Sequence, residues 1–207
     1  MTLPLSRAAW YSNLTNKILY IKNHPATCRD GFYFTASIHP NFSLLQGFCL
    51  ILSSYKKNMS VFTKSLPIAI GCDHAGFEYK TKIVPWLNQQ GWQVTDFGTY
   101  SVESVDYPDY VHPVAMSIEK EEAAFGILIC GTGNGVCMTA NKHAGIRAGL
   151  CWATDVAKLI RQHSNANIIC LPARFIALPA AQDMITVFMN TAFEGGRHQN
   201  RINKMTC

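Results

Sequence analysis

The chain has 207 residues, of which 48% are hydrophobic and 15% are charged, as expected for a globular protein with one domain of ordinary size. The net charge of +5 is unevenly distributed, because residues 1–65 hold seven Lys and Arg against one acid, whereas the remainder holds 11 bases against 12 acids. The main body is therefore near neutral and lacks the basic stripe of a nucleic-acid-binding protein.

Eight cysteines are scattered along the sequence without a Cys-x-x-Cys pair, which argues against a disulfide framework and against a structural metal site. Several lie in or beside apolar runs, as Cys170 does, where a thiol packs as a small hydrophobic group. We therefore expect a reducing, cytoplasmic setting. The longest apolar run, around Leu50–Leu52, is roughly half of the ~20 residues that a membrane helix needs, so no membrane association is expected.

Residues 1–65 show no sustained hydrophobic period, and they are predicted to be an N-terminal extension that is poorly structured or a start-site artefact. Their basic composition also loosely resembles an organelle transit peptide. We favour the start-site interpretation, in which translation begins at Met59.

From Leu66 onward, short apolar runs alternate with helical patterns. The predicted strands cover 67–71, 92–97, 125–130, 146–151 and 167–171, and the predicted helices cover 77–87, 110–122, 134–143, 153–163 and 178–191. This alternation predicts that residues 66–207 form one α/β domain with a doubly wound, Rossmann-like sheet of five parallel strands and helices on both faces.

Ligands of such sheets bind outside the carboxyl ends of the strands, so the residues that follow each strand are the first candidates for a site. Asp73 and His74 follow the first predicted strand, the glycine loop 131–135 follows the third, and Arg174 follows the fifth. Acidic, basic and nucleophilic groups are thus expected at one edge of the sheet.

The glycine loop, Gly131-Thr132-Gly133-Asn134-Gly135, lies between a buried strand and the start of a helix. Its amides can converge on a phosphate or on an enediolate oxygen. A turn without a ligand is one alternative. A dinucleotide-binding loop is another, but the Gly-x-Gly-x-Gly spacing and the position after the third strand disfavour it.

Cys130 ends the third strand beside a helix N-terminus, where the pKa of a thiol can be lowered and the sulfur can act as a base or a nucleophile. Taken alone, such a cysteine is more often a buried structural thiol, and the adjacent glycine loop favours the reactive interpretation. Asp73 and His74 fit proton transfer, although Asp73 equally fits a helix N-cap.

Two further groups lie near helix ends. His163 fits either a proton carrier or a partner for the helix dipole. Arg197 and Arg201 lie four apart in a helix that follows Gly195-Gly196, so they form either a fork for a phosphate ester or a solvated basic face.

Residues 66–207 resemble the ribose-5-phosphate isomerase B family, which also includes allose-6-phosphate and galactose-6-phosphate isomerases. The matching stretches follow the family's order, at 71–76, 104–110, 129–135, 141–142, 161–163 and 194–201. The resemblance implies an aldose–ketose isomerase of the pentose phosphate pathway, which interconverts ribose 5-phosphate and ribulose 5-phosphate through a cis-enediolate.

By this resemblance, Cys130 is the base that moves the proton between C2 and C1, and Thr132 assists proton transfer to the substrate oxygens. His163, with Asp73 nearby, opens the furanose ring. The enediolate is stabilised by the loop amides, namely those of Gly131, Thr132, Gly133, Asn134 and Gly135. The phosphate is held by His74, Arg174, Arg197 and Arg201, and Tyr107 lines the sugar site.

The resemblance implies no metal or cofactor. Its implied partners are a small-molecule sugar phosphate and a second copy of the chain, in a homodimer with shared sites or in a tetramer. One departure concerns His163-Ser164-Asn165, because many relatives continue the histidine as His-Asn-Asp. The Asn side chain at 164 is missing, and whether Asn165 replaces it is open.

Three alternatives remain at this point. A six-carbon sugar phosphate is the rival substrate, because pocket depth rather than the catalytic residues sets the chain length. A non-catalytic sugar-phosphate or nucleotide sensor is the rival from another class. A dinucleotide-binding oxidoreductase is the weakest of the three.

Overall fold

The computed structural model describes residues 61–205, so the predicted extension lies outside the described residues except for 61–65. Five parallel strands form one sheet in the order β2-β1-β3-β5-β4. The strands are β1 (Ile68–Cys72), β2 (Val94–Asp96), β3 (Phe125–Cys130), β4 (Ala148–Leu150) and β5 (Ile168–Pro172). The helices are α3 (Phe77–Gln89), α4 (Pro108–Glu119), α5 (Asn134–Ala140), α6 (Thr154–Ser164), α7 (Leu178–Asn190) and α8 (Arg197–Ile202). The predicted fold is confirmed.

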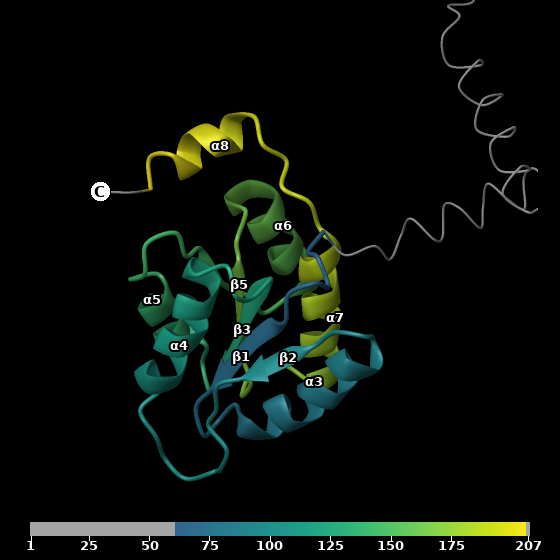
Figure 1. The fold of residues 1–207 in the computed structure, drawn as a ribbon, viewed down its shortest axis with the longest axis vertical. Coiled ribbons are helices and arrows are strands. Elements are labelled where there is room, and N and C mark those ends of the chain that lie inside the picture. Colours follow the sequence, from purple (N-terminus) through teal and green to yellow (C-terminus); the bar gives the residue numbers. More distant parts are fainter. Residues whose placement is uncertain (1–60, 206–207) are drawn as a thin grey trace, which may run out of the picture. The chain divides into compact units, whose positions relative to one another are not determined.

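Helices cover both faces of the sheet because successive side chains of a strand point to opposite sides. Ile68, Ile70 and Cys72 of β1 share one buried cluster with α3, α6 and α7, whereas Ala69 shares the other with α4 and α5. Figure 1 shows α4 and α5 on one side of the sheet and α3 and α7 on the other. The central strands are fully buried, which explains their unbroken apolar runs.

Several predicted boundaries differ from the observed ones at the ends of elements. Helix α4 begins at Pro108, two residues before the predicted start, because proline suits the first turn of a helix. Helix α5 ends at Ala140, where the Asn141 side chain accepts a bond from the Ala148 amide and donates one to its carbonyl, each 2.9 Å long. The edge strands β2 and β4 are each three residues long, shorter than their apolar patterns.

Strands β1 and β3 form the switch point of the sheet. The chain leaves β1 toward β2 on one side and then reaches β3 on the other, so their carboxyl ends flank a crevice. The Asp73 amide donates to the Ile129 carbonyl over 3.2 Å, which joins the two strands at their ends. Asp73 and Cys130 are thereby neighbours.

Residues just before the predicted domain contribute to its core. The Val61 amide donates to the Met189 carbonyl over 2.8 Å. The Phe62 ring lies 4.6 Å from that of Phe125 and 5.8 Å from that of Phe188. The Arg161 guanidinium lies 4.7 Å from the centre of the Phe62 ring. Within 61–205, no helix is long and apolar enough to cross a membrane.

These contacts predict where the chain can be shortened. A chain that begins at Met59 keeps Phe62, so we expect it to unfold at the temperature of the full chain. Phe62→Ala in that shortened chain should cost about 2 kcal/mol, because it removes a half-buried aromatic ring. Thermal unfolding measures both effects. An unchanged melting temperature for Phe62→Ala would contradict the role given to this ring.

Candidate active site

The glycine loop turns from β3 into α5 through backbone that only glycine fits. Gly133 has a φ of 71°, and a Cβ there would collide with the side chain of Leu150. A Cβ at Gly135 would come within 2.6 Å of the Tyr107 ring. The sequence therefore holds this turn in one conformation, with Tyr107 packed directly against it.

Arg174 is brought to the same loop by the turn after β5. Its amide donates to the Gly131 carbonyl over 3.1 Å, and its Nε lies 3.1 Å from the position of a Cβ on Gly131. The guanidinium thus lies over the first glycine of the loop, with its side chain exposed. At the tip, the Asn134 amide donates to the Thr132 hydroxyl over 3.4 Å.

Cys130 is nearly buried at the end of β3. Burial raises the pKa of its thiol, and a hydrogen bond with the Asp73 carboxylate raises it further, while the amides of Gly133 and Thr132 act in the opposite direction. The expectation of a lowered pKa is therefore wrong for this structure, because desolvation and Asp73 outweigh the loop amides. At neutral pH the resting sulfur is a thiol.

Asp73 and His74 follow β1 at the same edge. The Asp73 carboxylate is buried and accepts a bond from the Gly76 amide over 3.0 Å, so it both closes the turn before α3 and faces Cys130. The Val105 amide donates to Nδ1 of His74 over 3.4 Å. In the neutral ring this places the proton on Nε2, which can donate to a ligand.

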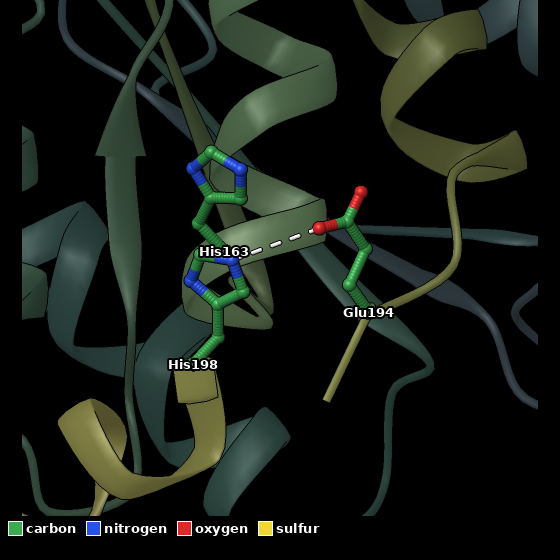
Figure 2. Close-up of side chains that lie close together, drawn as sticks. All are labelled: His163, Glu194 and His198. Carbon is green, nitrogen blue, oxygen red and sulfur yellow. Dashed lines mark ion pairs between the residues drawn. The ribbon is translucent and has the colours of Figure 1, made fainter. Parts of the chain in front are cut away.

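His163 belongs to a second group, shown in Figure 2 with Glu194 and His198. The rings of His163 and His198 are stacked, with centroids 4.2 Å apart and planes 6° from parallel. Nε2 of His198 lies 3.6 Å from a carboxylate oxygen of Glu194. Arg197 and Arg201 flank His198 on α8 and are exposed.

The predicted site residues thus fall into two groups within one chain. The carboxyl edge of the sheet holds one group, namely Asp73, His74, Tyr107, Cys130, Gly131, Thr132, Gly133, Asn134, Gly135 and Arg174. The ends of α6 and α8 hold the other, namely His163, Arg197 and Arg201. Among residues 61–205, no hydrogen bond, ion pair or ring contact joins the two groups.

Asn165 is occupied elsewhere. It follows α6 with a φ of 45°, a left-handed conformation that asparagine tolerates, and its side-chain oxygen accepts a bond from Arg161 over 3.0 Å. Arg161 is itself buried and also donates to the Ala166 carbonyl. In this structure the Asn165 side-chain oxygen therefore supports the end of α6.

Glu194 and His198 were not singled out from the sequence. The available signal was their spacing of four residues beside the double glycine, which places a carboxylate and an imidazole close together. A separate apolar groove of about 340 Å³ lies between α3 and β2 around the half-buried ion pair Lys80–Asp96, and none of its lining residues belongs to the predicted site.

A doubly wound sheet with a cysteine and an amide-rich loop at its switch point is the architecture of an α/β enzyme. Residues 68–205 match the family described as Ribose/Galactose Isomerase. The chain belongs to that family.

Individual relatives agree with this assignment. Ribose-5-phosphate isomerase B of Escherichia coli K12 is 44% identical over 140 residues, which cover 68% of this chain and 94% of the relative. A ribose 5-phosphate isomerase of Thermotoga maritima superposes with a TM-score of 0.66 at 52% identity, covering 67% of this chain and 96% of that one.

The Mycoplasma genitalium ribose-5-phosphate isomerase B, solved with bound ribulose-5-phosphate, has a TM-score of 0.65 at 41% identity. That alignment covers 68% of this chain and 94% of the other.

Alkylation tests how burial, Asp73 and the loop amides together set the pKa of the Cys130 thiol. Because its pKa is raised, we expect the rate of reaction with iodoacetamide to keep increasing as the pH rises through 9. Asp73→Asn keeps an acceptor for the Gly76 amide but removes the negative charge, so Cys130 should react faster at pH 7 to 8.

Peptide mass spectrometry is the readout, because the half-buried Cys137 has a lowered pKa and will react as well. Its rate serves as the internal control and should not change in the Asp73→Asn variant. A Cys130 rate that is equal or slower in that variant would show that Asp73 does not hold the thiol protonated.

Proposed function

We propose that this chain interconverts ribose 5-phosphate and ribulose 5-phosphate, with Cys130 as the base. The observation that carries the proposal is the position of Cys130 at the switch point, under the amides of Thr132 and Gly133 and beside Asp73. Relatives of 41 to 52% identity are described as ribose-5-phosphate isomerases, and one of them binds ribulose-5-phosphate.

Proton transfer follows from this arrangement. Because the resting sulfur is a thiol, its proton first passes to the hydrogen-bonded Asp73 carboxylate. The Cys130 thiolate then takes the proton from C2 of the open aldose, and the electron pair of that C–H bond forms the C1–C2 double bond of the enediolate. The negative charge moves to O1, where the loop amides stabilise it. Thr132 passes a proton between O1 and O2, and Cys130 returns its proton to C1, which gives the ketose.

Ring opening precedes this transfer, because the aldose phosphate is mainly cyclic. His163 takes or gives the proton of the ring oxygen and the C1 hydroxyl, with Asp73 assisting. The phosphate is held by charge-assisted bonds from four side chains, His74, Arg174, Arg197 and Arg201. Tyr107, packed on Gly135, forms a wall of the sugar site.

A homodimer with shared sites completes the proposal. His163 and the two arginines of α8 make no contact with the Cys130 group among the described residues, which supports a second subunit that supplies them to the same substrate. Trp152 and Phe175 follow β4 and β5 at the carboxyl edge and are 60% and 71% exposed, which is unusual for large apolar side chains unless a partner covers them. A tetramer would pair two such dimers.

A reducing, cytoplasmic setting is part of the proposal. It is supported by the five cysteines within the described residues, which are all free thiols. Cys130, Cys137 and Cys170 belong to the same hydrophobic cluster and still form no disulfide.

Six-carbon sugar phosphates remain the rival substrates, and the family description itself includes galactose. Ser164 is a reason to compare the substrates, because the asparagine that many relatives have at this position is absent here. The neighbouring Asn165 accepts a hydrogen bond from Arg161. The values of kcat/KM for ribose 5-phosphate, allose 6-phosphate and galactose 6-phosphate, measured side by side, decide between them. A sensor would show turnover with none of the three.

The role of Cys130 predicts a separation of turnover from binding. Cys130→Ala should reduce kcat by at least about 1,000-fold while the affinity for ribose 5-phosphate changes little, because the phosphate is held by other side chains. The wild type should also exchange the transferred hydrogen with deuterated solvent. Cys137→Ala, a thiol of the same fold region, is the control and should remain active. Turnover without any solvent exchange would point to hydride transfer instead.

Shared sites predict recovery of activity on mixing. Cys130→Ala and His163→Ala chains are each expected to be inactive, but a heterodimer regains one intact site from the unmutated Cys130 and His163. Random reassociation should then restore about a quarter of wild-type activity. No recovery from chains that are shown to exchange would place Cys130 and His163 of one subunit in the same site.

A further inference from the structure

We propose that His198 is a positioning residue for this reaction. Its stacked ring holds the ring of His163 and attaches α8 to α6, so that the ring-opening histidine and the two phosphate-binding arginines are placed as one unit. The inference rests on the proposed function, in which His163 opens the sugar ring.

The attachment of α8 carries the first part of the argument. Helix α8 has six residues, far fewer than a helix needs to be stable alone, so its position depends on tertiary contacts. His198 is the one residue of α8 that is buried, at 4% exposure, and its ring lies against His163 of α6. In Figure 1, α8 lies beside α6 at the end of the chain.

The protonation state of the His198 ring is the second support for this role. Its Nε2 faces Glu194, whereas its Nδ1 is buried and has no hydrogen-bond partner among the described residues. A neutral ring with the proton on Nε2 is therefore favoured, because protonated Nδ1 would leave a buried N–H unpaired. Burial and the nearby His163, Arg197 and Arg201 also lower the pKa of His198, against a smaller opposing effect of Glu194.

A neutral, flat ring suits this position. It stacks on His163 without adding positive charge beside the two arginines, which must attract a phosphate. Because His198 lies between Arg197 and Arg201 in the sequence of one short helix, fixing its ring also limits where both guanidinium groups can reach.

A metal site is the competing interpretation, since His163, Glu194 and His198 offer ligand atoms within 4.8 Å of one another. The lone pair of an imidazole nitrogen lies in the plane of its ring, and the two ring planes here are 6° from parallel and do not converge on one ion. Arg197 and Arg201 further disfavour a cation. The stacked geometry favours positioning.

The test compares two measurements on the full chain. Ribulose 5-phosphate carries its phosphate on O5 and cannot close a furanose ring, so solvent deuterium exchange at its C1 reports the Cys130 step without ring opening. His198→Ala should lower kcat for ribose 5-phosphate about tenfold and raise its KM, while exchange at saturating ribulose 5-phosphate falls less than about threefold.

Two replacements of His198 distinguish ring stacking on His163 from simple filling of the space that His198 occupies. His198→Phe keeps a flat ring and should recover most of the lost turnover, whereas His198→Leu fills the space without stacking and should remain impaired. Gln199→Ala, at an exposed position of the same helix, is the matched control and should behave as the wild type. The Phe and Leu variants carry the test if the alanine variant fails to fold.

The outcomes distinguish this inference from the proposed function. If His163→Ala lowers turnover of ribose 5-phosphate and His198→Ala does not, only the role of His198 is overturned. Equal activity of the Phe and Leu variants overturns the stacking argument. If His163→Ala also turns over ribose 5-phosphate normally, its ring-opening role fails and the positioning role fails with it.

Discussion

The turn from β3 into α5 depends on the left-handed backbone of Gly133, which lies so close to Leu150 that any side chain would collide with it. This one constraint directs the amides of Thr132 and Gly133 toward the sulfur of Cys130. The flanking glycines extend it, because Gly131 lets Arg174 lie over the loop and Gly135 lets the Tyr107 ring pack against it. The proposed base, the proposed anion site and two walls of the candidate site therefore come from one turn.

The electrostatics of Cys130 fit this arrangement. Burial and Asp73 keep the sulfur protonated at rest, while the loop amides favour a negative charge. In the proposed mechanism, the charge of the thiolate disappears when it accepts a proton from carbon, and a charge appears on the enediolate oxygen. The same amides can stabilise the charge on either atom, so little reorganisation is required during the reaction. The raised pKa of the free thiol is thus compatible with a base that is used only once the substrate is present.

The sequence predicted what depends on local pattern. The buried central strands were recognisable from runs such as Ile127–Ile129. Candidate site residues such as Asp73 and Arg174 were predicted from their places after the strands. The direction of the pKa shift at Cys130 was not predictable, because it depends on the depth of burial and on Asp73, which reaches Cys130 only through the pairing of β1 with β3. The predicted bounds of β2 and β4 were wrong because an edge strand ends where its hydrogen-bonded pairing ends, not where its apolar run ends.

His198 was missed for a related reason. In the sequence it stands between Arg197 and Gln199, among polar residues that suggest a solvated face, and its burial comes from contact with His163 on another helix. A helix as short as α8 gains little from its own hydrogen bonds, so the stack sets its place. Both groups of candidate site residues therefore depend on close contacts, at the glycines of the loop and at the stacked rings of His163 and His198. The glycine loop keeps its shape because no side chain fits at Gly133. Helix α8, which carries the two arginines, is held in place because the His198 side chain fits against His163.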